Sequence, residues 1–186
     1  MAAALRRELH EKLNATIALR LRCRLGSESD VAAEVCVATT HLFWNPKYPD
    51  LKLLQAFLVA SELEHFADTV PLILAGDLNS TPQMECGNES GVYELLTRGS
   101  IGAGHPHHPV ALRKQSGILS GVTTEQVPRL EVRPFRSGYL DAFSVDGPIT
   151  NASRDFTGCL DYILYRDGRD SIDTGIELLS AVALPS

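Results

Sequence analysis

The sequence contains no apolar run approaching the roughly 18 residues that a helix needs to cross a membrane. Its start, MAAALRRELHEKL, lacks the apolar core of a secretory signal and carries glutamates, unlike a transit peptide. The four cysteines show no CxxC or other metal-ligand spacing, so we expect reduced, mostly buried thiols. These absences predict a protein without membrane contact, located in the cytoplasm or, as the alternative, in the nucleus.

Positive charge is scarce as well. The chain carries 17 Lys and Arg against 23 Asp and Glu, a net charge of −6. A protein that coats long stretches of nucleic acid neutralises many phosphates, so this balance argues against that class. It does not exclude an enzyme that grips only the end of a strand. The length of 186 residues and the 44% of apolar residues fit one globular domain with a sizeable core.

Hydrophobic periodicity predicts an alternation of strands and helices. ATIALRLRC alternates apolar residues with Thr and Arg, which is typical of a strand with one solvated face, and the turn residues GSESD then lead into a second strand as a hairpin. Pro49 and Asp50 favour a helix start, and the following segment is apolar on most sides, as in a buried helix. The predicted elements are strands at 15–23, 34–42, 70–76, 159–165 and 176–184 and helices at 51–66 and 91–99, the second closed by Gly99.

The segment 100–137 shows no sustained period and is rich in glycine and proline, so we predict a surface loop or insertion. It contains HPHHP, with His105, His107 and His108. Three histidines suggest a metal site, but no cysteine or carboxylate stands at ligand spacing. A solvated loop is therefore the preferred interpretation.

Polar clusters follow or interrupt the apolar strands. In α/β folds with mixed sheets, such groups at the carboxyl ends of buried strands line the ligand crevice. Taken singly each cluster is weak, because a buried Asp before a turn is often an Asx turn or a helix cap and a strand His is often a core residue. The clusters are TTHL with His41, GDLN with Asp77 and Asn79, ITNASRDF with Asn151 and Phe156, and CLDYI with Asp161.

In combination the motifs resemble the endonuclease/exonuclease/phosphatase superfamily, which includes pancreatic deoxyribonuclease. The segments VATTHLFWNPKYPDLKLLQ, LILAGDLNSTP, SGVYELLTRGSI and ITNASRDFTGCLDYILY are most similar to its poly(A)-deadenylase branch, with the Angel and 2',5'-phosphodiesterase relatives. The resemblance implies an α/β fold: the C-terminal portion of a two-sheet α/β sandwich of deoxyribonuclease type, with mixed sheets and flanking helices. Residues 1–186 would then form a single, incomplete domain of this kind.

The resemblance also implies roles for residues that hydrolysis of a phosphodiester needs. Asp77 matches the aspartate that orients or deprotonates the attacking water, Asn79 an asparagine that holds the phosphate, and His41 a histidine that donates to a phosphate oxygen. Asp161 matches an acid that orients a catalytic histidine, and Asn151 a further substrate contact. Pro46 and Phe156 match the pair that flanks an adenine, where stacking is worth about 1–3 kcal/mol.

Parts of the family pattern are absent from this sequence. The glutamate that is the main ligand of the family's Mg²⁺ (or Mn²⁺) has no counterpart, which leaves Asp77 and Asn79 as secondary metal contacts, and the Ser-Asp-His motif expected near the C-terminus is missing. We therefore expect a truncated form of an active enzyme.

The function that follows is a magnesium-dependent 3'-to-5' exoribonuclease of the poly(A)-deadenylase type, acting on an adenine-rich 3' end of single-stranded RNA, with protein partners of a deadenylation complex. The alternatives are a 2',5'-phosphodiesterase acting on oligoadenylate and a non-catalytic half-domain that binds RNA or protein.

Overall fold

The computed structural model describes residues 7, 9, 11–12, 14–22, 33–116, 125, 127–145, 147–169 and 175–182. The elements along the chain are β1 (Thr16–Arg22), β2 (Glu34–His41), α2 (Pro49–Ala67), β3 (Leu72–Asp77), α3 (Gly91–Arg98), α4 (Pro109–Ser116), β4 (Arg136–Ser137), α5 (Gly138–Phe143), β5 (Asn151–Ala152), β6 (Thr157–Gly158) and β7 (Asp161–Arg166).

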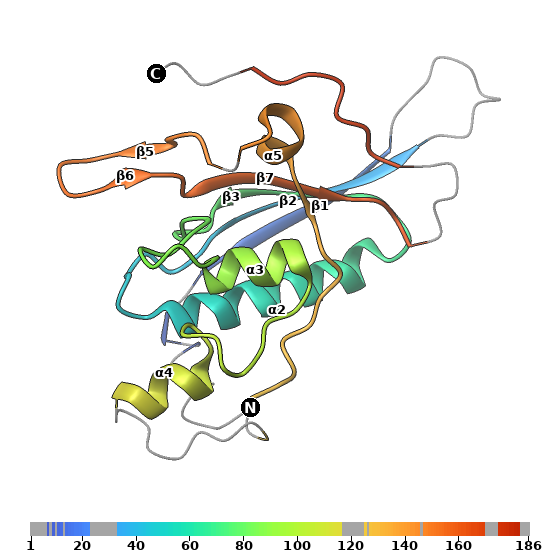
Figure 1. Ribbon diagram of the computed structural model, residues 1–186. Helices are drawn as coiled ribbons and strands as arrows, with labels where there is room; N and C mark the ends of the chain where they lie inside the picture. Colours follow the sequence, from blue (N-terminus) through green and yellow to red (C-terminus); the bar gives the residue numbers. More distant parts are fainter. Residues whose placement is uncertain are drawn as a thin grey trace.

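The core of the fold is a mixed five-stranded sheet with the strand order β1-β2-β3-β7-β4 (Figure 1). β1 and β2 are antiparallel, as the predicted hairpin requires, although its turn lies outside the described residues. β2 and β3 are parallel and are connected through α2, whereas β7 runs antiparallel to both β3 and β4. The mixed α/β class with flanking helices is confirmed. Among the described helices, none is both long and apolar enough to span a bilayer.

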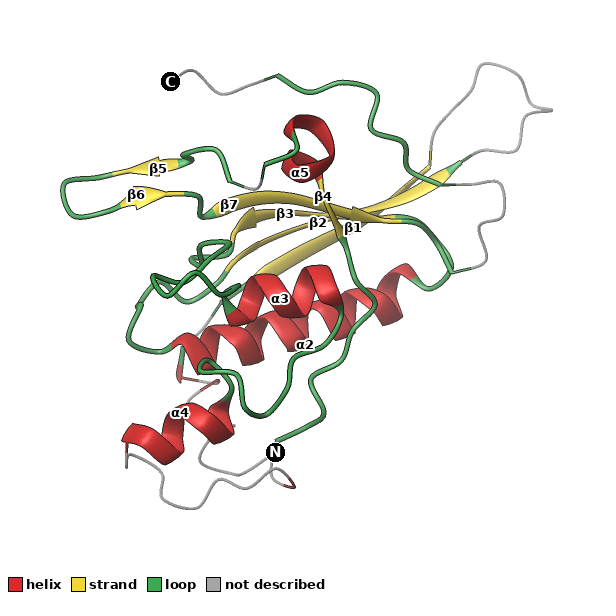
Figure 2. Cartoon of the chain, in the orientation of Figure 1, coloured by secondary structure: helices red, strands yellow, loops and turns green. Residues whose placement is uncertain are grey.

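The long helix α2 and the shorter α3 lie together against one face of this sheet (Figure 2). Alternate residues of the central strands point toward the helices and are buried, as the period-2 pattern predicts. They pack with small residues of α2 such as Ala56 and Ala60. The buried strand residues of this layer are Cys36, Ala38, Leu72, Leu74, Tyr162 and Leu164.

The opposite face of the sheet is largely uncovered among the described residues. Its most exposed apolar side chains belong to β1, whose Ile17 is 63% and Leu19 55% exposed, and to β7, where Ile163 is 51% exposed. The short helix α5 packs against β7 and β4, on the side of the sheet opposite α2 and α3. We call this surface, defined by Ile17, Leu19, Leu21 and Ile163, the open face.

Two expectations from the sequence differ from the structure. The segment 100–137 contains the helix α4, and its Ile101, Val127 and Leu130 are buried in a cluster with residues of α2 and α3. Its irregular sequence hides this packing because the buried positions follow no single period. The strand predicted at 176–184 is wrong: residues 175–182 have no regular structure, and Leu179 and Val182 are 86% and 92% exposed. An apolar run forms a strand only where a neighbouring strand pairs with it.

Candidate active site

Strand register brings His41, Asp77 and Asp161 side by side at one end of the sheet. His41 is the last residue of β2 and pairs with Asp77, the last residue of β3. Asp77 in turn pairs with Asp161, the first residue of β7. Residues in register on neighbouring strands point to the same face, which here is the open face. The imidazole Nε2 of His41 lies 3.6 Å from Oδ2 of Asp77, so the sequence prediction that these groups converge is met by the geometry.

The backbone around Asp77 is fixed by a close approach of β3 to β2 before this residue and by a turn after it. Gly76 has φ +149, and a Cβ built on it would lie 2.0 Å from the carbonyl oxygen of Thr40, so only glycine fits between the strands. After Asp77 the backbone enters the left-handed region at Asn79, with φ 47, a conformation that Asn tolerates. The Asn79 N–H donates to Oδ1 of Asp77 at 2.7 Å, which closes an Asx turn.

The same turn fixes the amide of Asn79. Its Nδ2 donates one hydrogen to the carbonyl oxygen of Leu42 at 2.8 Å, which ties the turn to the end of β2. Within the described part of the chain, the other hydrogen of this NH₂ group and the side-chain oxygen Oδ1 have no partner and are available to a ligand. The GDLN motif therefore fixes the turn and also leaves polar groups available to a ligand.

The environment of Asp77 raises its pKa. Burial disfavours the carboxylate and is the largest cause, and the negative charge of Asp161 acts in the same direction. The hydrogen bond from the Asn79 N–H and the positive charges of His41 and Lys52 oppose the rise without cancelling it. A carboxylate with a raised pKa is a stronger base, which suits proton removal from water.

Lys52 is a buried cation that the sequence prediction missed. It lies near the start of α2, is 6% exposed, and donates from Nζ to the carbonyl oxygen of Asn79 at 2.5 Å. Burial lowers its pKa, and the negative charge of Asp77 works against that change. A lysine within a helix that is apolar on most sides was the available signal, because such a residue is rarely buried without a partner.

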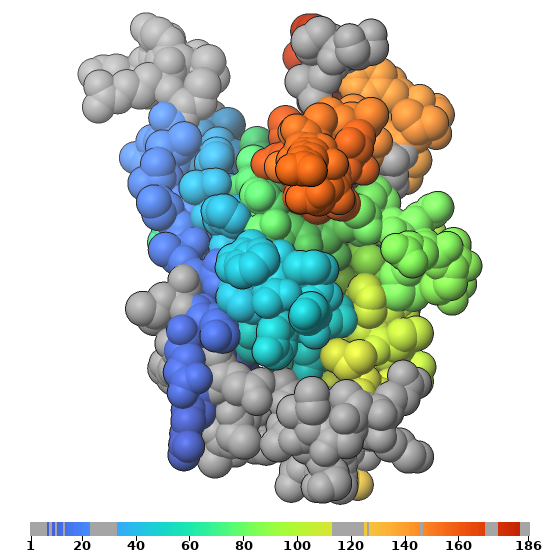
Figure 3. Space-filling model, turned by 90° about the vertical axis from the view of Figure 1, so that its left-hand side faces the viewer, coloured from blue at the N-terminus to red at the C-terminus, as the bar shows by residue number. Residues whose placement is uncertain are grey.

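Pro46 and Phe156 line one cavity of about 760 Å³, together with Lys52 and Asn79. Pro46 belongs to the segment after β2, and Phe156 to the turn of the β5–β6 hairpin. In Figure 3 this hairpin, in orange, stands above the cyan segment that leads into α2. The two residues that the resemblance assigns to an adenine thus share one recess with the asparagine that it assigns to the phosphate.

The remaining predicted residues, Asp77 and Asp161 included, are not among those that line this cavity. His41, with a side chain 70% exposed, lines a separate cavity of about 720 Å³ with Phe43 and Trp44. Asn151 is exposed on β5 opposite Gly158 and is not among the residues that line either cavity. Its neighbour Thr150 accepts hydrogen bonds from the backbone N–H groups of Leu160 and Asp161 at 2.9 and 3.0 Å, so the hairpin is anchored to the start of β7.

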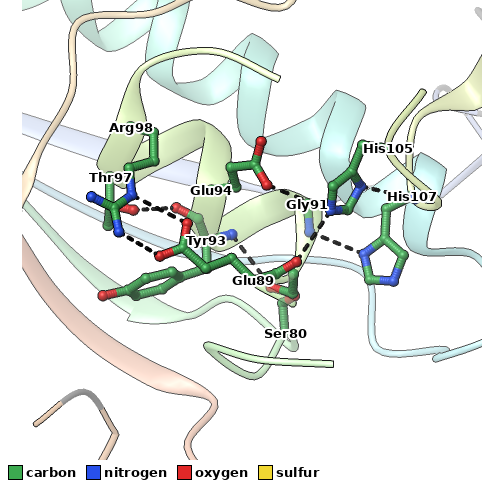
Figure 4. Close-up of polar contacts among 10 residues, drawn as sticks. Ser80, Glu89, Gly91, Tyr93, Glu94, Thr97, Arg98, His105 and His107 are labelled. Carbon is green, nitrogen blue, oxygen red and sulfur yellow. Dashed lines mark hydrogen bonds and ion pairs between the residues drawn. The ribbon is translucent and has the colours of Figure 1, made fainter. Parts of the chain in front are cut away.

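The histidines of the HPHHP motif do not form the expected solvated loop. His108 is 5% exposed, and the side chain of His105 is 9% exposed. His105 Nε2 lies 3.1 Å from the carbonyl oxygen of Glu89, and His107 Nδ1 accepts from the N–H of Gly91 (Figure 4). The prediction was wrong because the imidazoles supply hydrogen bonds to backbone groups next to α3, contacts that the local sequence does not reveal.

The described residues do not by themselves make a metal site. No group of three or more His, Cys, Asp and Glu side chains in this part of the chain is placed to hold a metal ion. Asp77 and Asp161 offer carboxylate oxygens, the ligand type that Mg²⁺ and Mn²⁺ prefer, but this ligand set is incomplete.

Comparison with known proteins finds no matching family model. The chain is 29% identical over 153 residues to CCR4-NOT transcription complex subunit 6-like-B of Xenopus laevis, covering 69% of this chain and 25% of the relative. It is also 29% identical over 167 residues to human 2',5'-phosphodiesterase 12, covering 87% of this chain and 23% of the relative. Its fold matches the crystal structure of ANGEL2, a 2',3'-cyclic phosphatase, with a TM-score of 0.58, 24% identity, and coverage of 82% of this chain and 49% of that chain.

The chain resembles the deadenylase branch of the endonuclease/exonuclease/phosphatase superfamily. The resemblance predicted from the motifs is thereby confirmed, and the relatives in this branch carry the names of enzymes. The chain spans about a quarter of the length of the curated relatives and about half of the ANGEL2 chain. What the comparisons show is therefore sequence similarity to these relatives and a shared fold.

Proposed function

We propose that this chain carries part of the active site of a phosphodiesterase that removes nucleotides from the 3' end of RNA, with a preference for adenine, as a poly(A) deadenylase does. The observation that carries the proposal is the row of His41, Asp77 and Asp161 at the strand ends, joined through Asn79 to a cavity lined by Pro46 and Phe156. Acid–base and amide groups lie at one end of this arrangement and a slot for a flat base at the other.

The chemistry assigned to the row follows from the groups themselves. Asp77, with its raised pKa, takes a proton from the attacking water, and Asn79 donates from its amide to a phosphoryl oxygen. His41 lies 3.6 Å from Asp77 and donates to a second phosphoryl oxygen when protonated. Asp161, paired in register with Asp77, holds a catalytic imidazole that this chain does not provide among its described residues.

We also propose that the intact enzyme requires Mg²⁺ or Mn²⁺. Bound there, such an ion would supply charge stabilisation at the phosphoryl oxygens. Since the described donor set is incomplete, the main ligand comes from residues outside it, and Asp77 and Asn79 contribute at most secondary contacts. The proposed setting is the cytoplasm or the nucleus, in a deadenylation complex such as the one for which one relative is named.

The decisive test compares two isosteric substitutions in the chain incubated with labelled oligo(A) and Mg²⁺. Asp77→Asn removes the proposed base and is expected to reduce the hydrolysis rate at least ~100-fold, because general-base catalysis typically contributes ~10²–10⁴-fold. Glu62→Gln, which removes an exposed carboxylate on α2, is the matched control and is expected to leave the rate unchanged. Equal rates for both variants would contradict the proposal.

Two alternative functions are separated by the same assay. Faster hydrolysis of 2',5'-linked than of 3',5'-linked oligoadenylate would identify the chain as a 2',5'-phosphodiesterase, the name that a relative carries. Binding of oligo(A) without turnover, unaffected by Asp77→Asn, would instead favour a non-catalytic half-domain that binds RNA.

The base slot is tested by Phe156→Ala. Because stacking on an aromatic ring is worth about 1–3 kcal/mol, we expect a ~5- to 150-fold loss of affinity for oligo(A) and a smaller loss for oligo(U), so that the preference for adenine falls. Fluorescence anisotropy with labelled oligomers measures both. Phe66→Ala is the control, since Phe66 lies on α2 and, at 45%, is as exposed as Phe156 at 36%. An unchanged adenine preference in Phe156→Ala would remove the assigned role of this residue.

A further inference from the structure

The ring of His107 is held in one tautomer by the start of α3. The backbone N–H of Gly91, the first residue of α3, donates to Nδ1 of His107 at 3.1 Å. An imidazole nitrogen that accepts a hydrogen bond carries no hydrogen, so the neutral ring keeps its hydrogen on Nε2. The approach is close: a Cβ on Gly91 would lie 2.8 Å from the Cβ of His107, so a side chain at position 91 would displace His107.

The surroundings of His107 keep the ring neutral. Burial lowers its pKa to about 4, and the nearby charges of His105 and Lys52 act in the same direction. The ring of His105 packs edge to face against that of His107 with centroids 5.3 Å apart. The backbone N–H of His107 donates to Nδ1 of His105 at 3.0 Å. Around neutral pH the ring is therefore a hydrogen-bond donor of fixed direction and not a cation.

The other nitrogen of this ring belongs to the cavity of the proposed function. His107 lines the recess shared by Pro46, Lys52, Asn79 and Phe156. Figure 4 shows Nδ1 turned toward Gly91 and the second ring nitrogen pointing away from the drawn contacts. Within the described part of the chain, Nε2 has no hydrogen-bond partner, so its hydrogen is available to a ligand in the recess.

We propose that His107 determines base specificity in this cavity: its Nε2–H donates to a ring nitrogen of a purine held between Pro46 and Phe156. The inference rests on the proposed function, which supplies the ligand, a nucleotide. It adds His107 as the group that distinguishes one base from another. Adenine N1 is unprotonated and accepts a hydrogen bond, whereas guanine N1 carries its own hydrogen and would place two donors face to face. A site built to hydrogen-bond one edge rejects the edge that cannot complete the bond.

Lys52 does not serve this purpose. Its Nζ is turned to the carbonyl oxygen of Asn79, and a buried ammonium group favours an anionic acceptor such as a phosphate. The His107 imidazole is a neutral donor held in a fixed direction, and it comes from the HPHHP segment, outside the motifs that carry the resemblance.

The test measures AMP binding to the chain by NMR titration. His107→Phe keeps the ring shape and removes the donor, and we expect about three- to tenfold weaker binding, the usual effect of losing one neutral hydrogen bond. His107→Gln presents an amide N–H at the position of Nε2 and is expected to restore most of the affinity. His65→Phe removes an exposed histidine of α2 and is the control. Thermal unfolding of each variant separates a loss of the donor from a loss of the fold.

Analogues of the base identify the acceptor. With AMP analogues in which N1, N3 or N7 is replaced by a CH group, one analogue is expected to bind the wild type and His107→Phe equally well, because the partner of Nε2–H is already gone. If every analogue retains the difference between the two proteins, or if His107→Gln binds as weakly as His107→Phe, the donor role is overturned.

The outcomes distinguish this inference from the proposed function. AMP binding with the expected His107 dependence, without hydrolysis of oligo(A), supports the inference and contradicts the enzymatic proposal. Hydrolysis that requires Asp77, with the same adenine preference in His107→Phe, does the reverse. An imidazole NMR spectrum with the hydrogen on Nδ1, or an absence of AMP binding, overturns the inference whatever the activity.

Discussion

The pKa of Asp77 depends on neighbours that come from several different elements of the fold. Burial and the charge of Asp161 raise its pKa, while the Asn79 N–H, His41 and Lys52 lower it. Asp161 takes part because β7 runs antiparallel to β3 and begins at the level where β3 ends. The strength of the proposed base is therefore a property of strand register as much as of Asp77 itself.

This coupling predicts the effect of Asp161→Asn on the pH profile of hydrolysis. The substitution removes a negative charge beside Asp77, so the pKa of Asp77 falls and the ionised base persists to lower pH. The acid limb of the rate profile is expected to move to lower pH. Glu62→Gln should leave the limb in place. A limb that stays or moves upward in Asp161→Asn would show that Asp77 is not the group that controls it.

At the scale of elements, the sequence pattern correctly predicted those helices and strands whose limits depend on nearby residues. Gly99 closes α3 in the left-handed conformation with φ +85, as its position after the periodic residues indicated. The β1–β2 hairpin follows from alternation and turn residues, and β3 follows from a short apolar run bounded by turn residues, whereas its parallel pairing with β2 is seen only in the structure. The segments that were misjudged, 100–137 and 176–184, depend on tertiary partners: α4 and its neighbours pack onto α2, and residues 175–182 have no strand beside them.

The residues of the candidate site also fall into those that the sequence predicted and those that only the structure reveals. Asp77 directly follows a predicted strand, whereas His41 and Asp161 lie within predicted strands, so the expectation that they meet depends on the motifs in combination, and the register of the sheet places all three at one edge. Lys52 and His107 were not predicted as residues of this site. The signal for Lys52 is its place within a helix that is apolar on most sides, and the bond that fixes His107 comes from Gly91, sixteen positions earlier in the chain.

Gly76→Ala is predicted to disturb the pairing that holds this edge together. The added Cβ would meet the Thr40 carbonyl oxygen at 2.0 Å at a φ of +149, where side chains are strained. Overpacking and backbone strain of this kind cost about 2–4 kcal/mol together. Chemical denaturation should show a loss of this size, with oligo(A) hydrolysis reduced further because β2 and β3 separate where His41 meets Asp77. Gly102→Ala, at a position with nothing within 4 Å, is the control. A variant as stable as the control would contradict the close-approach argument.

At the scale of the whole molecule, the sheet is covered on one face only among the described residues. α2 and α3 bury one side, while the open face presents Ile17, Leu19, Leu21 and Ile163. Exposed apolar side chains that share one face of a sheet are typical of a contact site or of a tendency to associate. The row of His41, Asp77 and Asp161 lies on this same face, since His41 and Asp77 follow the alternation of Val37 and Ile73 in their strands. Whatever covers the apolar part of the sheet also lies next to the proposed chemistry.

The exposed surface predicts that the isolated chain associates through its open face. Leu19→Thr combined with Ile163→Thr removes apolar area there while keeping residues that favour strands. Sedimentation velocity should show a larger fraction of monomer than in the wild type, together with weaker fluorescence of a hydrophobic dye. Leu58→Gln, which removes an apolar side chain 37% exposed on α2, tests whether any loss of surface hydrophobicity has the same effect, and we expect it not to. If the wild-type chain is monomeric and binds no dye, or if the control behaves like the double variant, the association does not occur through this face.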